Sequence, residues 1–207
     1  MTEHSNSLVS SALDVEIARA EIYGLLSAFY YASPAADLLA QVRVAATDTP
    51  EAGAFLEEPW RAFVGVARSM SDKSVQNEYD DLFGGIGKPE VYLYGSHFLN
   101  GFLNEKSLAR LRTDLQSLGL ERSDAMADTE DHIAYLFEVM RYLVAGDDVA
   151  VANLTQQREF FSKHIQPWVN SMCNDIKMNK KAVFYAALSD LTVAFMGIEA
   201  QGFDMLA

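Results

Sequence analysis

Apolar residues recur every three or four positions along most of the chain, which is the spacing that places them on one face of a helix. The clearest stripes lie in the segments 15–29, 56–70, 75–83, 108–118, 133–143 and 184–198. No segment shows the apolar–polar alternation of a half-buried strand followed by a hairpin turn. The pattern therefore predicts an all-α fold, a single globular domain of about eight to ten helices over residues 1–207.

Polar residues suggest where two of these helices begin. Ser11 and Asp14 resemble a capping box, so residues 1–10 are expected to form a loosely held arm before the first helix. A later helix is expected to start at Asp128 or Thr129. With Asp128 as its N-cap, Asp131 would occupy the third helical position, where a carboxylate stabilises free backbone N–H groups.

The segment 121–131, read as ERSDAMADTED, interrupts the helical pattern in the second half of the chain. It is polar, rich in acid and without the period of a core-forming helix. We interpret it as a hinge between an N-terminal and a C-terminal helical part. If the hinge extends, the part beyond it can be exchanged between two copies, so the expected state is a monomer or a domain-swapped dimer.

The stretch from Glu78 to Leu99, EYDDLFGGIGKPEVYLYGSHFL, is the most irregular part of the sequence. Three glycines and Pro89 oppose both helix and strand near its centre. The aromatic residues Tyr79, Phe83, Tyr92 and Tyr94 flank this centre. They either fill the core around an awkward loop or line an apolar groove that carries hydroxyl groups and suits a peptide.

The composition of the chain limits the compartment and the kinds of partner that we expect. The chain has 207 residues, 50% of them hydrophobic, without an apolar run long enough to span a membrane, and its N-terminus lacks the features of a secretory signal. The single cysteine, Cys173, cannot form an internal disulfide, and these absences together favour a cytoplasmic protein. The formal charge of -13 argues against nucleic acid and anionic membranes, so a partner chosen by charge is basic. The acidity could equally serve only solubility.

Catalytic and metal-binding motifs are absent from the sequence. It contains no CxxC, HExxH or Glu-x-x-His spacing and no GxGxxG motif, so we expect no catalytic residue, no metal ligand and no cofactor. Cys173 is interpreted as a small core residue rather than a nucleophile. The glycine-rich loop Gly84–Lys88 leaves an alternative open, a small helical nucleotide-binding protein or enzyme, although neither a strand before it nor a Ser or Thr after the lysine supports a phosphate loop.

Asp131 and His132 also have two interpretations. They could face a groove as a paired acid and imidazole, able to exchange hydrogen bonds or charge near neutral pH. They could instead serve only the start of a helix, which local physics favours, because successive helix residues point about 100° apart.

Several segments, in order along the chain, resemble the TorD/DmsD family of cytoplasmic redox-enzyme maturation chaperones. They are RAEIYGLLSAFYYASP at 19–34, EYDDLFGGIG followed by YLYGSHFL within 78–99, LRTDLQSLGL at 111–120, EDHIAYLFEVMRYL at 130–143 and EFFSKHIQPWV at 159–169. The resemblance implies an all-helical fold without catalysis. It implies a protein that binds the twin-arginine signal peptide of a molybdoenzyme precursor, and in some members the mature part, and that holds the precursor for molybdenum cofactor insertion before export.

The resemblance also implies a peptide-binding site. Carried over to this chain, its residues are Tyr79, Leu82, Phe83, Tyr94, Gly95, Ser96, Asp131 and His132. Two positions depart from the family pattern, since Leu93 and Glu130 stand where relatives commonly have proline. Glu130 is expected to add negative charge beside Asp131 and so to favour a cationic peptide.

Overall fold

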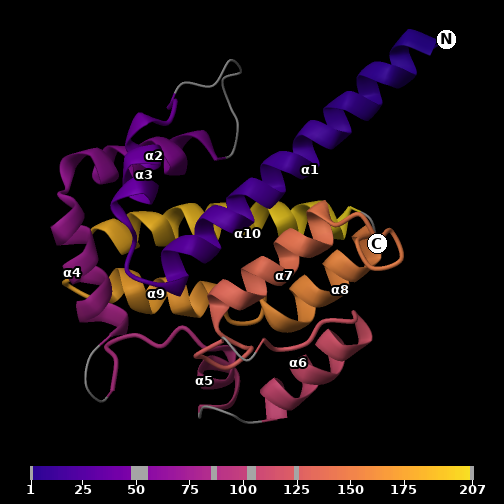
Figure 1. Cartoon of the computed structure of the whole chain (residues 1–207). Helices are drawn as coiled ribbons and strands as arrows, with labels where there is room; N and C mark the ends of the chain where they lie inside the picture. Colours follow the sequence, from indigo (N-terminus) through magenta and orange to yellow (C-terminus); the bar gives the residue numbers. More distant parts are fainter. Residues whose placement is uncertain (1, 48–55, 85–87, 102–105, 124–125, 206–207) are drawn as a thin grey trace.

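The computed structural model describes residues 2–47, 56–84, 88–101, 106–123 and 126–205, with side chains from residue 15 onward. Within these ranges the chain forms ten helices and no strand, which confirms the predicted all-α fold (Figure 1). They are α1 (Thr2–Tyr31), α2 (Ala36–Val44), α3 (Glu57–Ser69), α4 (Asp72–Phe83), α5 (Gly95–Asn100), α6 (Lys106–Ser117), α7 (Ile133–Ala145), α8 (Leu154–His164), α9 (Val169–Met178) and α10 (Phe184–Asp204). None of the described helices has the length and apolar character needed to cross a bilayer.

The core forms where α1 packs against α7 and where α10 packs against α3 and α9. Aromatic side chains join these helices. The Tyr23 ring of α1 lies 5.9 Å from the Phe137 ring of α7 and 4.8 Å, edge-on, from the Phe195 ring of α10. All three rings are buried. The apolar stripes predicted from the sequence therefore meet in one continuous core.

Two buried carboxylates tie distant helices together. Glu199 of α10 accepts hydrogen bonds from the Arg19 guanidinium of α1 at 2.8 Å and from the Tyr23 hydroxyl at 2.9 Å. Glu78 of α4 accepts the backbone N–H groups of Val183 and Tyr185 at 2.9 and 2.8 Å. These N–H groups lie at the start of α10 and have no partner within the helix. Glu78 therefore fixes α4 to the start of α10.

Two predicted helix starts are wrong. The first helix begins at Thr2 rather than after Ser11, because a helix that packing has nucleated extends through residues of moderate propensity. The helix expected from Asp128 or Thr129 begins at Ile133, with His132 as its N-cap. Asp131 therefore stands outside α7 rather than at its third position, because its carboxylate is held by a different part of the chain.

The short helix α5 begins inside the stretch Glu78–Leu99 that the sequence marks as irregular. It begins at Gly95 and ends at Asn100, followed by Gly101 in the left-handed conformation with φ of 77°. Gly119, which follows α6, is also in the left-handed conformation, with φ of 70°. Of the glycine-rich loop Gly84–Lys88, residues 85–87 lie outside the described ranges.

Candidate functional site

The segment before α5 and the segment before α7 lie side by side. Tyr94 and His132 form an isolated antiparallel β-bridge. The Gly95 N–H donates to the carbonyl of Asp131 at 3.0 Å, and the Ile133 N–H donates to the carbonyl of Leu93 at 2.8 Å. Two groups of residues implied by the family resemblance, far apart in the sequence, therefore meet at one junction.

Asp131 is a buried acceptor at this junction, with 3% of its surface exposed. One of its oxygens, Oδ2, accepts the Ser96 N–H at 2.8 Å, and Oδ1 accepts the Thr129 hydroxyl at 2.6 Å. The bond to Ser96 places a negative charge at the first turn of α5, at the positive end of the helix dipole. Asp131 thus orders two segments and is not itself open to a ligand in this conformation.

His132 is also buried, with 4% of its surface exposed. Its Nδ1 accepts the Ala134 N–H at 3.2 Å, so in the neutral ring the proton sits on Nε2. Burial lowers the pKa of His132 to about 4, although the carboxylates of Asp128 and Asp131 act in the opposite direction. The ring is therefore neutral near pH 7 and serves as a helix cap and a packing surface.

Gly95 allows α8 and α9 to approach the junction closely. A Cβ atom at this position would lie 3.0 Å from Nε1 and 3.1 Å from Cε2 of Trp168. The Trp168 indole is fixed in turn, since its Nε1 donates to the carbonyl of His164 at 2.6 Å and its ring stacks on Phe98 at 5.5 Å. Packing against Trp168 therefore explains why glycine, and not a larger residue, stands between Tyr94 and Ser96.

An acid–tyrosine cluster covers the outer side of the junction and consists of Asp128, Tyr31, Tyr79, Tyr94 and Tyr135. The Tyr94 hydroxyl donates a hydrogen bond to the Asp128 carboxylate. Its ring meets the His132 ring edge-on at 5.0 Å, and the Tyr135 ring lies 5.7 Å from both His132 and Tyr31. Asp128 is partly exposed, and Tyr31 is 48% exposed. The cluster therefore presents an acid and phenol rings to solvent.

Tyr79 joins this cluster from α4. Its hydroxyl donates to the backbone carbonyl of Tyr31 at 3.1 Å, and its ring lies 5.2 Å from Phe83. Burial raises the pKa of Tyr79 to about 12, with the carboxylates of Asp128 and Asp80 adding to the effect. Burial likewise raises the pKa of Tyr94, reinforced by its hydrogen bond to Asp128. Both phenols are therefore neutral hydrogen-bond donors under physiological conditions.

Leu82 and Phe83 follow Tyr79 at the end of α4. Leu82 is fully buried, and its carbonyl accepts the Val91 N–H at 3.0 Å. Phe83 is partly buried and meets the Tyr185 ring edge-on at 5.0 Å. The eight residues that the resemblance implies thus divide into buried supports and partly exposed rings. Tyr92 lies apart from the cluster and stacks on His97 at 4.2 Å.

An apolar pocket of about 280 Å³ lies beside the cluster and shares Tyr135 with it. Its apolar lining comes from α6, α7 and the segment before α7: Leu115, Leu120, Met126, Val139 and Tyr142. Its charged lining is mixed: the acids Glu121 and Glu138 are accompanied by Arg122 and Arg141, and Arg141 pairs with Glu138 at 2.8 Å. Glu130 lines the pocket as well, but it is 7% exposed and accepts two hydrogen bonds from Arg112, both at 2.9 Å, so its charge is neutralised. The expected extra acid beside Asp131 is therefore already paired within the fold.

Sequence reasoning missed Tyr31, Asp128 and Tyr135 as members of the site. Tyr31 appeared only within the segment 19–34 that carries the family resemblance, and Asp128 only as a helix cap. A usable signal was the run of acids in 121–131 next to a histidine, which could have marked Asp128 as well as Asp131. The contact of Tyr135 with Tyr31 and that of Asp128 with Tyr94 depend on tertiary packing, so the sequence alone does not reveal them.

The described residues contain no group of three or more His, Cys, Asp or Glu side chains placed to hold a metal ion. Cys173 is fully buried, and burial raises the pKa of its thiol to about 12, so it is a core residue as predicted. Lys88 of the glycine-rich loop is exposed, with its Nζ 6.0 Å from the centre of the Tyr92 ring. The acid–tyrosine cluster and its neighbouring apolar pocket are thus the candidate site that the structure offers at this junction.

The family follows from comparison with known proteins. A family model described as Nitrate reductase delta subunit matches residues 49–174, more than half of the chain, so the chain belongs to this family. It is the family of redox-enzyme maturation chaperones that the sequence resembles. Its members are chaperones of molybdoenzyme maturation and bind molybdoenzyme precursors; they are not enzymes. Among curated proteins there is no significant match.

Proposed function

We propose that this chaperone binds the twin-arginine signal peptide of a molybdoenzyme precursor in the cytoplasm and holds the precursor for molybdenum cofactor insertion before export. The observation that carries the proposal is the acid–tyrosine cluster, in which the partly exposed Asp128 carboxylate is surrounded by phenol rings. The matched family range contains all of this cluster except Tyr31.

The chemistry of the cluster suits arginine. A guanidinium group forms paired hydrogen bonds to a carboxylate and stacks on aromatic faces, whereas an ammonium group makes only point contacts. Asp128 offers the carboxylate, and Tyr31 and Tyr135 offer rings that lie 5.7 Å apart. Cation–π contact with such rings contributes about 0.5–2 kcal/mol. The net charge of -13 steers a cationic segment toward the protein before contact.

The apolar pocket beside the cluster suits the apolar part that follows the arginines of a signal peptide. Its lining of Leu115, Leu120, Met126 and Val139 offers the surface on which leucine or phenylalanine side chains are buried. Met126 gives this surface adaptability, since an unbranched thioether side chain accommodates different shapes. In this proposal Asp131 and His132 are positioning residues, because they fix Tyr94 and the start of α7 without being exposed themselves.

Calorimetric titration with a synthetic twin-arginine peptide tests the assignment. We expect Asp128→Asn to weaken binding about tenfold, because the substitution removes the charge while keeping an acceptor for the Tyr94 hydroxyl. The matched control is Asp175→Asn on α9, which removes one exposed acid that does not line the cluster and should leave the affinity unchanged. Equal affinities of the wild type and Asp128→Asn would overturn the site.

We also propose that 121–131 acts as a hinge through which copies exchange their C-terminal parts. The Arg112–Glu130 ion pair opposes this exchange, because Glu130 belongs to the hinge and the pair holds the hinge against α6. Arg112→Ala should therefore increase the dimer fraction seen by light scattering after size-exclusion chromatography. A monomer at every concentration, in both the wild type and the variant, would contradict the proposal.

A further inference from the structure

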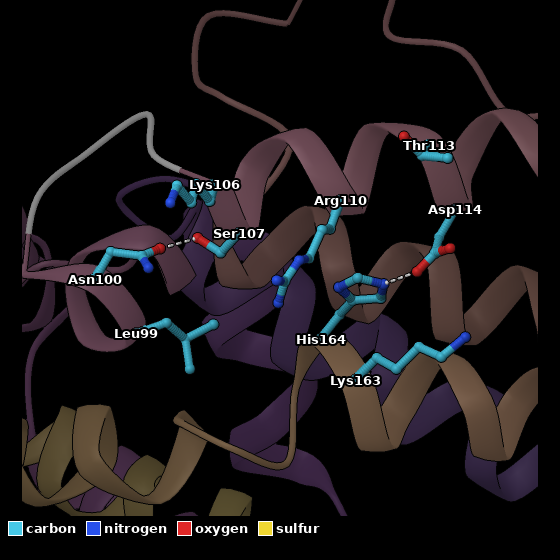
Figure 2. A pocket seen from close by; sticks show the side chains of 9 residues that line it. All are labelled: Leu99, Asn100, Lys106, Ser107, Arg110, Thr113, Asp114, Lys163 and His164. Carbon is cyan, nitrogen blue, oxygen red and sulfur yellow. Dashed lines mark hydrogen bonds and ion pairs between the residues drawn. The ribbon is translucent and has the colours of Figure 1, made fainter.

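A cavity of about 710 Å³ lies between α5, α6 and α8 (Figure 2). It shares no lining residue with the acid–tyrosine cluster. Its lining includes the cationic side chains of Lys106, Arg110 and Lys163, of which Lys163 is paired with Glu159 at 3.1 Å, and one acid, Asp114. This concentration of positive charge is notable because the chain as a whole carries a formal charge of -13. The volume falls in the range of about 300–1,000 Å³ that is usual for small-molecule sites.

The two ends of this basic cavity differ in chemistry. At one end lie Lys106 and the Asn100 and Ser107 side chains, which are joined by a hydrogen bond of 2.5 Å (Figure 2). At the other end, Nε2 of His164 lies 2.7 Å from the Asp114 carboxylate. Burial lowers the pKa of His164, so the ring is neutral near pH 7, and its Nε2–H donates to Asp114. The Arg110 guanidinium points into the space between these ends (Figure 2).

Lys106 and Arg110 point to a ligand that carries concentrated negative charge. They stand four positions apart at the start of α6, so their side chains occupy the same face of the helix. Two like charges at this spacing repel each other, and within the described part of the chain neither is joined to an acid by an ion pair. The described first turn of α6 also has no acidic residue, so the positive end of the helix dipole adds to the positive potential there.

We propose that this cavity binds an organic phosphate, with the phosphate group between Lys106 and Arg110. Cations one helical turn apart converge on one multiply charged group, whereas the carboxylates of an acidic peptide are spread along its chain. The cavity is much larger than a phosphate ion, which leaves room for an organic ring. Leu99, 41% exposed, offers that ring an apolar contact, and the Asp114 carboxylate accepts a hydrogen bond from a ring N–H group.

Calorimetry in a phosphate-free buffer tests this proposal with inorganic phosphate, pyrophosphate, AMP, GMP and tetraglutamate as probes. We expect saturable binding of pyrophosphate and at least one nucleotide, with the nucleotide tighter than inorganic phosphate because of its ring. Lys106→Ala/Arg110→Ala should weaken this binding by at least about tenfold, since both charge-assisted contacts are lost. Raising the salt concentration should weaken it in the wild type, because these cations are exposed to solvent.

The control is Lys73→Ala/Lys180→Ala, which removes the same charge from two exposed lysines that do not line the cavity and should leave phosphate binding intact. Both double variants should keep the wild-type melting temperature and affinity for the twin-arginine peptide, so failure here is distinct from failure of the signal-peptide proposal. Equal phosphate binding by both double variants would overturn the assignment. Tighter binding of tetraglutamate than of every phosphate compound would overturn the ligand class.

Discussion

The two ends of the six-residue helix α5 differ in both charge and construction. At its start, Gly95 and Ser96 are held by buried backbone and carboxylate bonds from Asp131, beneath an acid–tyrosine cluster. At its end, Leu99 and Asn100 border a cavity whose charged groups are mostly exposed. The start of α5, called the acidic end below, thus owes its geometry to buried hydrogen bonds. The end of α5, called the basic end, owes its charge to exposed side chains. Substitutions at the two ends should therefore separate effects on stability from effects on binding.

The largest expected effect lies at the buried acidic end. Asp131→Ala leaves the Ser96 N–H and the Thr129 hydroxyl without the acceptor that each uses. We expect it to lower the free energy of unfolding by about 4 kcal/mol, because the buried Ser96 N–H loses a charged acceptor and the partly buried Thr129 hydroxyl loses its own, at about 1–3 kcal/mol for each group left without a partner. Urea denaturation followed by circular dichroism measures this loss. The control is Thr113→Ala at the exposed basic end, which should change the free energy by less than about 0.5 kcal/mol. Similar stabilities of the two variants would show that Asp131 does not hold the junction.

A second, slightly smaller effect is expected from pH. His132 has a pKa of about 4 in the folded protein, below the ordinary value of 6.5, because burial disfavours its charged form. The unfolded chain therefore binds this proton first as the pH falls, and stability is lost between about pH 6.5 and 4. The loss should approach about 3 kcal/mol, since each unit of pKa difference corresponds to about 1.4 kcal/mol.

His132→Asn isolates this contribution, since asparagine keeps an acceptor for the Ala134 N–H but does not titrate. Burial also lowers the pKa of His164. His164 therefore makes stability fall with decreasing pH in both the wild type and His132→Asn. Urea denaturation at several pH values should show a shallower loss of stability for His132→Asn than for the wild type. Parallel pH profiles would contradict the burial of a neutral His132.

The smallest expected change in stability concerns the exposed part of the acidic end. Asp128→Asn keeps the hydrogen bond to Tyr94 and removes only a partly solvated charge, so stability should change by less than about 0.5 kcal/mol. Its peptide affinity should nevertheless fall about tenfold, as proposed above. Thermal unfolding alongside the peptide titration tests this separation. A large loss of stability would place Asp128 with Asp131 among the structural supports.

The long helices follow from the sequence because their cores are periodic. Phe184, Leu188, Leu191 and Phe195 are all buried on α10, as their spacing predicts. The start of α7 could not be predicted in the same way. The Ser96 N–H donates a tertiary hydrogen bond to the Asp131 carboxylate, which keeps Asp131 outside the helix. The helix start predicted at Asp128 or Thr129 is therefore lost, and His132 becomes the N-cap. The six-residue helix α5 is too short to show a period.

The candidate site shows the same division between local and tertiary information. The family resemblance named Tyr79 and Tyr94, whereas the Tyr31–Tyr135 contact joins the ends of segments about a hundred positions apart and leaves no local pattern. The basic cavity likewise joins α6 to α8. Its one local signal was the spacing of Lys106 and Arg110, which places two cations on one helix face.

A double-mutant cycle between Asp128 and the peptide arginines tests the central claim most directly. Peptides with Arg-Arg and with Lys-Lys are each titrated into the wild type and into Asp128→Asn, and the coupling free energy is taken from the four affinities. If the Asp128 carboxylate binds a guanidinium group in paired geometry, the preference for Arg-Arg should shrink in the variant, with a coupling energy of at least about 1 kcal/mol. A coupling energy near zero, with the same preference for Arg-Arg in both proteins, would contradict recognition of the twin arginines at this cluster.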